Sequence, residues 1–102
     1  PLLTEPVAPG IRDGYGDPAV LRTPEGWHLV VTSNDAPDAF PLLFSPDLEH
    51  WEHRGFVFPE GRPPAWALTG EGEADFWAPE LHRVGEAYWL VFTARNHARE
   101  LC

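Results

Sequence analysis

The stretch Pro-Ala-Val-Leu-Arg-Thr-Pro-Glu-Gly-Trp-His-Leu-Val-Val-Thr at residues 18–32 returns as Pro-Glu-Leu-His-Arg-Val-Gly-Glu-Ala-Tyr-Trp-Leu-Val-Phe-Thr at residues 79–93. Eight residue pairs keep a constant separation of 61 positions without a gap, and five of them are identical. The pairs are Pro18/Pro79, Val20/Leu81, Arg22/Arg83, Trp27/Tyr88, Leu29/Leu90, Val30/Val91, Val31/Phe92 and Thr32/Thr93. We interpret them as two copies of one β-hairpin, the alternative being two unrelated hairpins that look alike by composition.

Short strands separated by turn residues also fill the segment between the two copies. No window shows helical periodicity over three turns, so the sequence predicts an all-β chain. The first four strands should form an antiparallel meander, with strands at residues 19–22, 27–32, 42–45 and 56–58. Residues 59–74 are rich in Gly and Pro and predict a long connecting loop, a feature that is often functional in compact domains.

The repeated hairpin favours a β-propeller, in which four-stranded blades recur at a period of roughly 40–50 residues that a long loop can lengthen. The chain would then supply blade one and the first half of blade two, over residues 11–102, after an N-terminal extension at residues 1–10. Because propellers close with about 4–8 blades, we expect the chain to be an incomplete domain.

Composition and charge exclude several classes of protein. The formal net charge is −9, with acids scattered along the chain, which argues against binding to nucleic acid or to an anionic membrane surface. About a quarter of the residues are Leu, Ile, Val or Phe, above the roughly 20% that marks disorder. No apolar run reaches the roughly 18 residues of a membrane span, and a single cysteine rules out an internal disulfide or a cysteine metal site.

The two copies of the hairpin differ at the positions that carry carboxylates. Asp17 pairs with Ala78, and Ala19 pairs with Glu80, so each copy has one acid where its first strand begins. The first strand of a blade lines the central channel, and the two acids should therefore lie near one mouth of it. Paired carboxylates across a cleft are what glycoside hydrolysis requires. The alternative is that Asp17 only forms a turn before Pro18 and that Glu80 is a solvated side chain.

Several strings resemble glycoside hydrolase family 43. They are Gly-Asp-Pro-Ala-Val-Leu (16–21), Ser-Pro-Asp-Leu-Glu-His-Trp-Glu (45–52), Phe-Trp-Ala-Pro-Glu-Leu (76–81) and Ala-Tyr-Trp-Leu-Val-Phe-Thr-Ala (87–94), which together cover most of residues 11–97. The resemblance implies a five-bladed β-propeller that hydrolyses arabinose- or xylose-containing glycans with inversion of configuration.

The resemblance also implies roles for single residues. Asp17 matches the general base that activates water, and Glu80 matches the acid that tunes the pKa of the general acid. Many family members have Asp where this chain has Glu80. The general acid, a Glu, has no match and is expected beyond residue 102. Asp13 is the alternative to Asp17, and Asp75 is the alternative to Glu80.

Aromatic side chains outside the regular strands are candidates for stacking on the apolar face of a sugar ring. Trp77, beside the acid motif, is the first candidate, and Phe40 and Trp66 in loops are weaker ones. We expect no metal and no cofactor. His50 and His53 form a His-x-x-His string, but they flank Trp51 in a turn and lack the Glu of a zinc-protease helix.

Two other functions stay open at this point. One is a related five-bladed glycosidase that acts on fructans, and the other is a non-catalytic carbohydrate-binding propeller that has lost its acids. The presence of both Asp17 and Glu80 favours a hydrolase whose partner is a carbohydrate substrate. A structural β-domain with a coincidental repeat is the remaining alternative.

Overall fold

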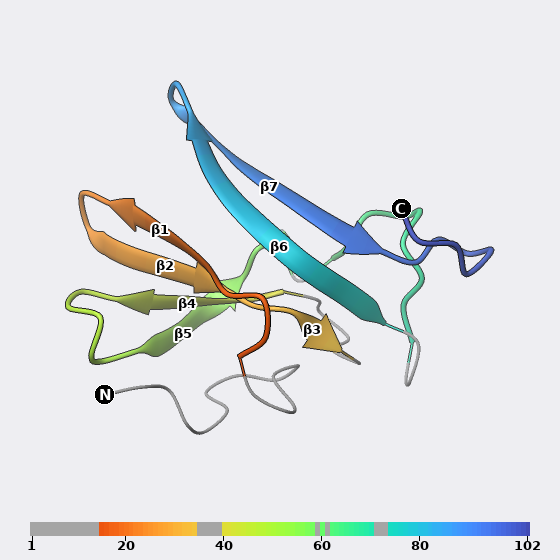
Figure 1. Ribbon diagram of the computed structural model, residues 1–102, viewed down its shortest axis with the longest axis horizontal. Coiled ribbons are helices and arrows are strands. Elements are labelled where there is room, and N and C mark those ends of the chain that lie inside the picture. The colour runs from red at the N-terminus through yellow and green to blue at the C-terminus, as the bar shows by residue number, and fades with distance from the viewer. Residues whose placement is uncertain (1–14, 35–39, 59, 61, 71–73) are drawn as a thin grey trace.

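The computed structural model describes residues 15–34, 40–58, 60, 62–70 and 74–102, which form two antiparallel β-sheets (Figure 1). These residues contain strands and turns without an α-helix, which confirms the all-β prediction. Within the same ranges, no helix is long and apolar enough to cross a bilayer. The predicted boundary at residue 11 and the candidate Asp13 lie outside the described residues.

The first sheet contains four strands that follow one another in space as they do in the chain. They are β1 (Ala19–Thr23), β2 (Gly26–Val30), β4 (Pro41–Ser45) and β5 (Glu52–Phe56), and their order in the sheet is β1-β2-β4-β5. All neighbouring strands are antiparallel. This is the predicted meander, and it has the strand number of a propeller blade.

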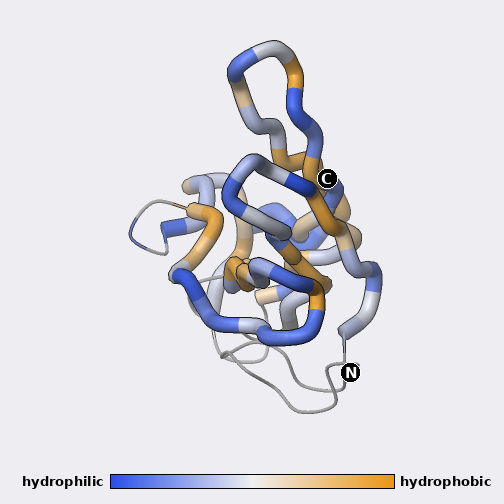
Figure 2. Tube along the Cα trace, turned by 90° about the vertical axis from the view of Figure 1, so that its left-hand side faces the viewer, coloured by the Kyte–Doolittle hydropathy of each residue, from blue (hydrophilic) through white to orange (hydrophobic). Residues whose placement is uncertain are grey.

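The second sheet joins a short strand to a long hairpin. Its strands are β3 (Ser33–Asn34), β6 (Asp75–Val84) and β7 (Ala87–Ala94), in the order β3-β6-β7. Because β3 follows β2 after two residues and pairs with the start of β6, the chain crosses directly from the first sheet to the second. The β6–β7 hairpin extends beyond the other strands in both Figure 1 and Figure 2.

The repeat in the sequence is also a repeat of the backbone pairing. In β1–β2 the partners run from Ala19↔Val30 to Thr23↔Gly26, and in β6–β7 from Glu80↔Val91 to Val84↔Ala87. Each pair in the second hairpin lies 61 positions after its counterpart in the first. The interpretation of residues 18–32 and 79–93 as two copies of one hairpin is therefore confirmed.

The prediction of the fourth strand at residues 56–58 was wrong, because β5 occupies Glu52–Phe56. The sequence of β5 begins with three exposed polar residues and shows no alternation, so its pattern does not indicate a strand. It forms nevertheless by backbone pairing along β4. The apolar residues Val57 and Phe58 follow the end of the strand and pack against the core instead.

The main core lies between the two sheets and is built on a group of phenylalanine rings. Phe40 and Phe76 are fully buried, and Phe58 and Phe92 pack against them with ring centroids 5.5–6.1 Å apart. Tilted and edge-on contacts of this kind add to the stability that burial of the rings provides.

We expect Gly26→Ala to destabilise the fold by about 1–3 kcal/mol, because a half-buried site that is already full must shift to admit a methyl group. A Cβ at Gly26 would lie 2.6 Å from the carbonyl oxygen of Ser45 and 2.8 Å from the ring of Phe44. Chemical unfolding of the complete protein that carries this chain measures the effect. Gly16→Ala is the control, because a Cβ there would meet nothing within 4 Å. Equal unfolding midpoints for the two variants would contradict the prediction.

Candidate active site

The candidate site begins at an irregular backbone step that occurs once in each copy of the hairpin. Asp17 has a φ of 49° and Ala78 a φ of 48°, and each stands directly before a proline. The left-handed region is uncommon for residues with a Cβ, although Asp tolerates it better than most. In β6 the step coincides with a register shift between Trp77 and Glu80. Such steps direct side chains away from the regular alternation of a strand and are frequent beside active sites.

Thr32 connects the two irregular steps. Its Oγ1 donates a hydrogen bond of 2.6 Å to Oδ2 of Asp17 and accepts one of 3.0 Å from the N–H of Ala78. The backbone N–H of Thr32 donates to the carbonyl of Gly16 at 3.0 Å. The two parts of the chain that carry the candidate acids are therefore joined at one hydroxyl group.

Asp17 and Glu80 line one cleft of about 400 Å³ between the starts of the two hairpins. Its lining residues come from two short segments, Asp17 to Val20 and Ala78 to His82. Among the residues that the structure describes, these two are the only carboxylates in that lining. The repeat predicted that the two acids lie near each other, and their positions in this cleft are compatible with that prediction.

Glu80 has a basic neighbour that the sequence reasoning did not identify. Nε2 of His82 lies 3.3 Å from Oε2 of Glu80, and both side chains are more than half exposed. Residues two apart on a strand lie on one face, so the spacing of Glu80 and His82 was the signal that could have indicated this pair.

Trp77 and Asp75 form a separate cluster with Arg95. The guanidinium carbon of Arg95 lies 5.2 Å from the ring centroid of Trp77, and Nε of Arg95 donates to Oδ2 of Asp75 at 3.2 Å. This contact covers one face of the indole and is a cation–π interaction. Asp75, the alternative to Glu80, is held in an ion pair and does not line the cleft.

The proposal of Phe40 as a sugar-binding residue was wrong. Its side chain has no exposed surface and forms the centre of the phenylalanine core, where it contacts the rings of Phe58, Phe76 and Phe92. Its position in a presumed loop was misleading, because it stands immediately before β4. Trp66 is 42% exposed and stacks on Phe92 with centroids 5.9 Å apart. Neither Trp66 nor Trp77 is part of the lining of the cleft.

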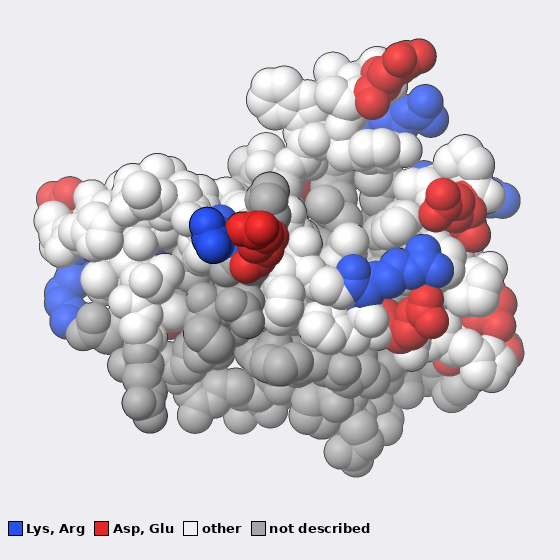
Figure 3. Space-filling model, turned by 180° about the vertical axis from the view of Figure 1, so that it is seen from behind, with Lys and Arg blue, Asp and Glu red and all other residues white. Residues whose placement is uncertain are grey.

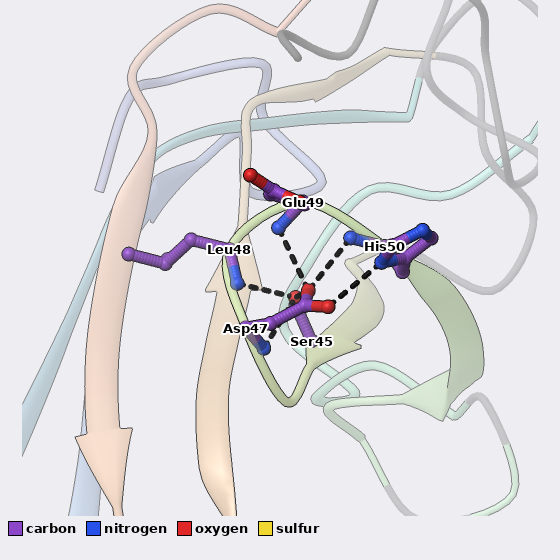
Figure 4. Close-up of polar contacts among 5 residues, drawn as sticks. All are labelled: Ser45, Asp47, Leu48, Glu49 and His50. Carbon is purple, nitrogen blue, oxygen red and sulfur yellow. Dashed lines mark hydrogen bonds and ion pairs between the residues drawn. The ribbon is translucent and has the colours of Figure 1, made fainter.

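The His-x-x-His string lies in the loop between β4 and β5, where Asp47 organises the backbone (Figure 4). Its Oδ1 accepts the N–H groups of Glu49 and His50, each at 2.8 Å, and its Oδ2 accepts Nδ1–H of His50 at 2.7 Å. Ser45 Oγ accepts two further N–H groups of the loop. His53 instead contacts the carbonyl of Gly55, so the two histidines have separate partners. The close approach of Asp47, Glu49 and His50 is explained by these bonds within a turn.

These bonds shift two pKa values in opposite directions. The backbone N–H of His50 and then its ring hold the pKa of Asp47 well below its usual range. The hydrogen bond and the charge of Asp47 raise the pKa of His50 above its usual 6.5. Both groups are exposed, so the interaction organises the loop more than it stabilises the whole fold.

Charges elsewhere are arranged as local pairs. On the face shown in Figure 3, arginine side chains lie beside acidic ones. The described ion pairs include Arg54 with Glu52 at 2.9 Å and Arg62 with Glu60 at 3.3 Å. These two guanidinium groups are neutralised by neighbours two residues away and contribute little basic surface.

Comparisons with known proteins agree with this architecture. The sequence pattern described as glycosyl hydrolases family 43 matches residues 4–101. Xylosidase/arabinosidase 43B of Humicola insolens is 29% identical over 94 residues, which are 91% of this chain and 16% of that protein. The crystal structure of a thermostable family-43 glycoside hydrolase matches with a TM-score of 0.67 and 29% identity, over 86% of this chain and 27% of that one.

The blade-like sheet, the second copy of its β1–β2 hairpin and the structural match define the fold as part of a five-bladed β-propeller, as the family resemblance implied. The chain belongs to glycosyl hydrolases family 43. It spans about a sixth of the length of the curated relative and about a quarter of the solved structure.

We expect Asp47→Asn to lower the pKa of His50 toward its usual value, because the amide removes the charge and the acceptor that hold the imidazolium. In the native loop, the contribution of His50 is complete below about pH 6.5 and is lost as the pH rises through its raised pKa. The contribution of Asp47 is complete above about pH 4 and is lost as the pH falls through its lowered pKa. The loop is therefore best held between about pH 4 and 6.5.

Titration of the His50 ring resonances by NMR in the complete protein checks this expectation. Glu52→Gln is the matched control, because Glu52 is not among the groups that shift His50. An unchanged titration midpoint in Asp47→Asn would show that the contact is absent in solution.

Proposed function

We propose that this chain contributes to the catalytic site of a glycosidase that hydrolyses arabinofuranosyl or xylosyl linkages with inversion. The cleft lined by both Asp17 and Glu80 carries the proposal. Membership in glycosyl hydrolases family 43 and the name of the xylosidase/arabinosidase relative support the reaction type and the substrate class. The partner of the site is accordingly an arabinose- or xylose-containing glycan.

In this proposal Asp17 is the general base. Its carboxylate takes a proton from a water molecule, the water oxygen attacks the anomeric carbon, and the bond to the leaving oxygen breaks. A general acid must protonate that oxygen, and in inverting enzymes the two carboxyl groups stand about 6.5–9.5 Å apart so that water fits between them. We assign the general acid to none of the described residues.

Glu80 is proposed to raise the pKa of that general acid through its negative charge. A carboxylate near a second carboxyl group disfavours the ionised form of its neighbour, which keeps the acid protonated and ready to donate. The position of Glu80 in the same cleft as Asp17 supports this role. His82 on the same strand gives Glu80 a polar neighbour at 3.3 Å.

Trp77 is retained as the proposed sugar-stacking residue, with Trp66 as the weaker second candidate. Trp77 directly precedes Ala78, which lines the cleft, and the indole is only partly buried. Arg95 holds one of its faces, so the ring has a defined orientation before a substrate arrives. Trp66 keeps 42% of its surface exposed but is farther along the chain from the lining residues.

We expect Asp17→Asn to lower kcat by about 10²–10⁴-fold, the usual contribution of a positioned general base. The amide has the same shape and cannot accept the proton of water. Hydrolysis of aryl arabinofuranoside and aryl xyloside by the complete protein measures the change, and ¹H NMR of the first product formed shows whether the anomeric configuration inverts. Glu86→Gln in the β6–β7 turn is the control and should leave kcat unchanged.

Three results would decide against parts of this proposal. Retained activity in Asp17→Asn would remove Asp17 as the base and direct attention to Asp13. A retained configuration in the product would exclude the inverting mechanism. Sugar binding without hydrolysis in the native protein would favour the carbohydrate-binding alternative.

A separate prediction concerns Glu80→Gln. Because removal of the charge lowers the pKa of the neighbouring acid, the alkaline limb of the kcat/KM profile should move to lower pH. The direction follows from the requirement that this acid be protonated for activity. A pH–rate profile of the complete protein measures the shift, with Glu52→Gln on the distant strand β5 as the control. An alkaline limb that stays in place would exclude Glu80 from this role.

A further inference from the structure

Thr32 makes three hydrogen bonds around Asp17 that the proposed reaction does not yet use. Its hydroxyl bonds the Asp17 carboxylate and the N–H of Ala78, and its own N–H bonds the carbonyl of Gly16. One residue therefore holds both the carboxylate of Asp17 and the backbone immediately before it. The bond to Ala78 spans 46 positions of the sequence and reaches the second hairpin.

The direction of each bond is settled by chemistry. A backbone N–H can only donate, so Oγ1 of Thr32 accepts from Ala78. The single hydroxyl proton is then available for Asp17, whose ionised carboxylate can only accept. The 2.6 Å separation between Oγ1 and Oδ2 is typical of a charge-assisted bond to a carboxylate. The hydroxyl therefore has one preferred orientation, in which it donates to Asp17 and accepts from Ala78.

We propose that Thr32 is a positioning residue that aims the carboxylate of Asp17 at the attacking water and fixes the distance between the strands of Asp17 and Glu80. The inference rests on the proposed function of Asp17 as general base. Because Oδ2 is engaged by Thr32, the oxygen that meets the water is Oδ1. Ala78 stands two residues before Glu80, so the same hydroxyl sets how the second acid approaches the cleft.

The strained backbone explains why such a residue is needed. Asp17 has a left-handed backbone conformation and precedes the start of β1, so strand pairing does not hold its backbone in place. A misplacement of about 1 Å in a reacting group can cost about 10²-fold in rate. Thr32 bonds the Asp17 carboxylate through its hydroxyl and the Gly16 carbonyl through its N–H, and these two bonds restrain both the side chain and the backbone of Asp17.

The repeat provides a matched control within the same chain. Thr93 is the counterpart of Thr32, and its register partner Trp77 is the counterpart of Gly16. The residue equivalent to Asp17 in that hairpin is Ala78, which has no carboxylate. Thr93→Val therefore makes the same chemical change in the same backbone setting, without a base to position.

The test compares kcat and KM of Thr32→Val, Thr32→Ser and Thr93→Val in the complete protein. We expect Thr32→Val to lower kcat by about 10–100-fold while KM stays within about threefold, because the base is misaimed and the sugar contacts remain. Thr32→Ser keeps the hydroxyl and should restore kcat to within about threefold. Thr93→Val should match the native protein, and circular dichroism verifies that every variant is folded.

A double-mutant cycle with Asp17→Asn identifies the route of the effect. If Thr32 acts through Asp17, Thr32→Val causes no further loss in the Asp17→Asn background. Additive losses, or a Thr32→Val enzyme with native kcat, would overturn the inference while leaving Asp17 as the base. Should Thr32→Val fail to fold, low kcat in the folded Thr32→Ser variant would overturn it as well. Native activity in Asp17→Asn alone would instead refute the proposed function on which the inference rests.

Discussion

The two sheets depend on the short pairing between β3 and the start of β6. Two residues after β2, the chain leaves the first sheet and hydrogen-bonds to the strand that begins the second, through Ser33↔Phe76 and Asn34↔Asp75. This pairing fixes the position of β6 relative to β1, the first strand of the other hairpin. The fully buried side chains of Phe76 and Phe40 then pack against each other in the core between the two sheets. Without this crossover, Asp17 and Glu80 would belong to two hairpins with no defined separation.

The candidate site arises because two hairpins share one backbone conformation and carry different side chains at equivalent positions. The left-handed step before a proline occurs in both hairpins, and the strand pairings that follow have the same register. One copy has Asp at the step and Ala after the proline, whereas the other has Ala at the step and Glu after the proline. A symmetric scaffold therefore presents an asymmetric pair of acids. Under the proposed function this asymmetry gives the two carboxylates different roles, Asp17 as the base and Glu80 as the group that raises the pKa of the general acid.

The parts of the fold that follow from local patterns could be predicted from the sequence. The gapless repeat indicated both hairpins and their register, and the position of one acid in each copy indicated a shared cleft. Polar β5 could not be predicted, because its pairing with β4 supplies what its residue pattern lacks. The burial of Phe40 and the hydrogen bonds of Thr32 could not be predicted either, since both depend on contacts between distant parts of the chain. A single sequence contains no signal for such contacts.

The left-handed backbone at Asp17 has an evolutionary consequence. The conformation suits Asn about as well as Asp, and it suits Gly better than either. Exchange of the carboxylate for an amide at this position therefore adds no backbone strain, and its structural cost is confined to a weaker hydrogen bond from Thr32. Under the proposed function, selection for the reaction would be what maintains an acid here. Under the proposed function, one exchange at this position would remove the base and leave the backbone around the sugar site unchanged.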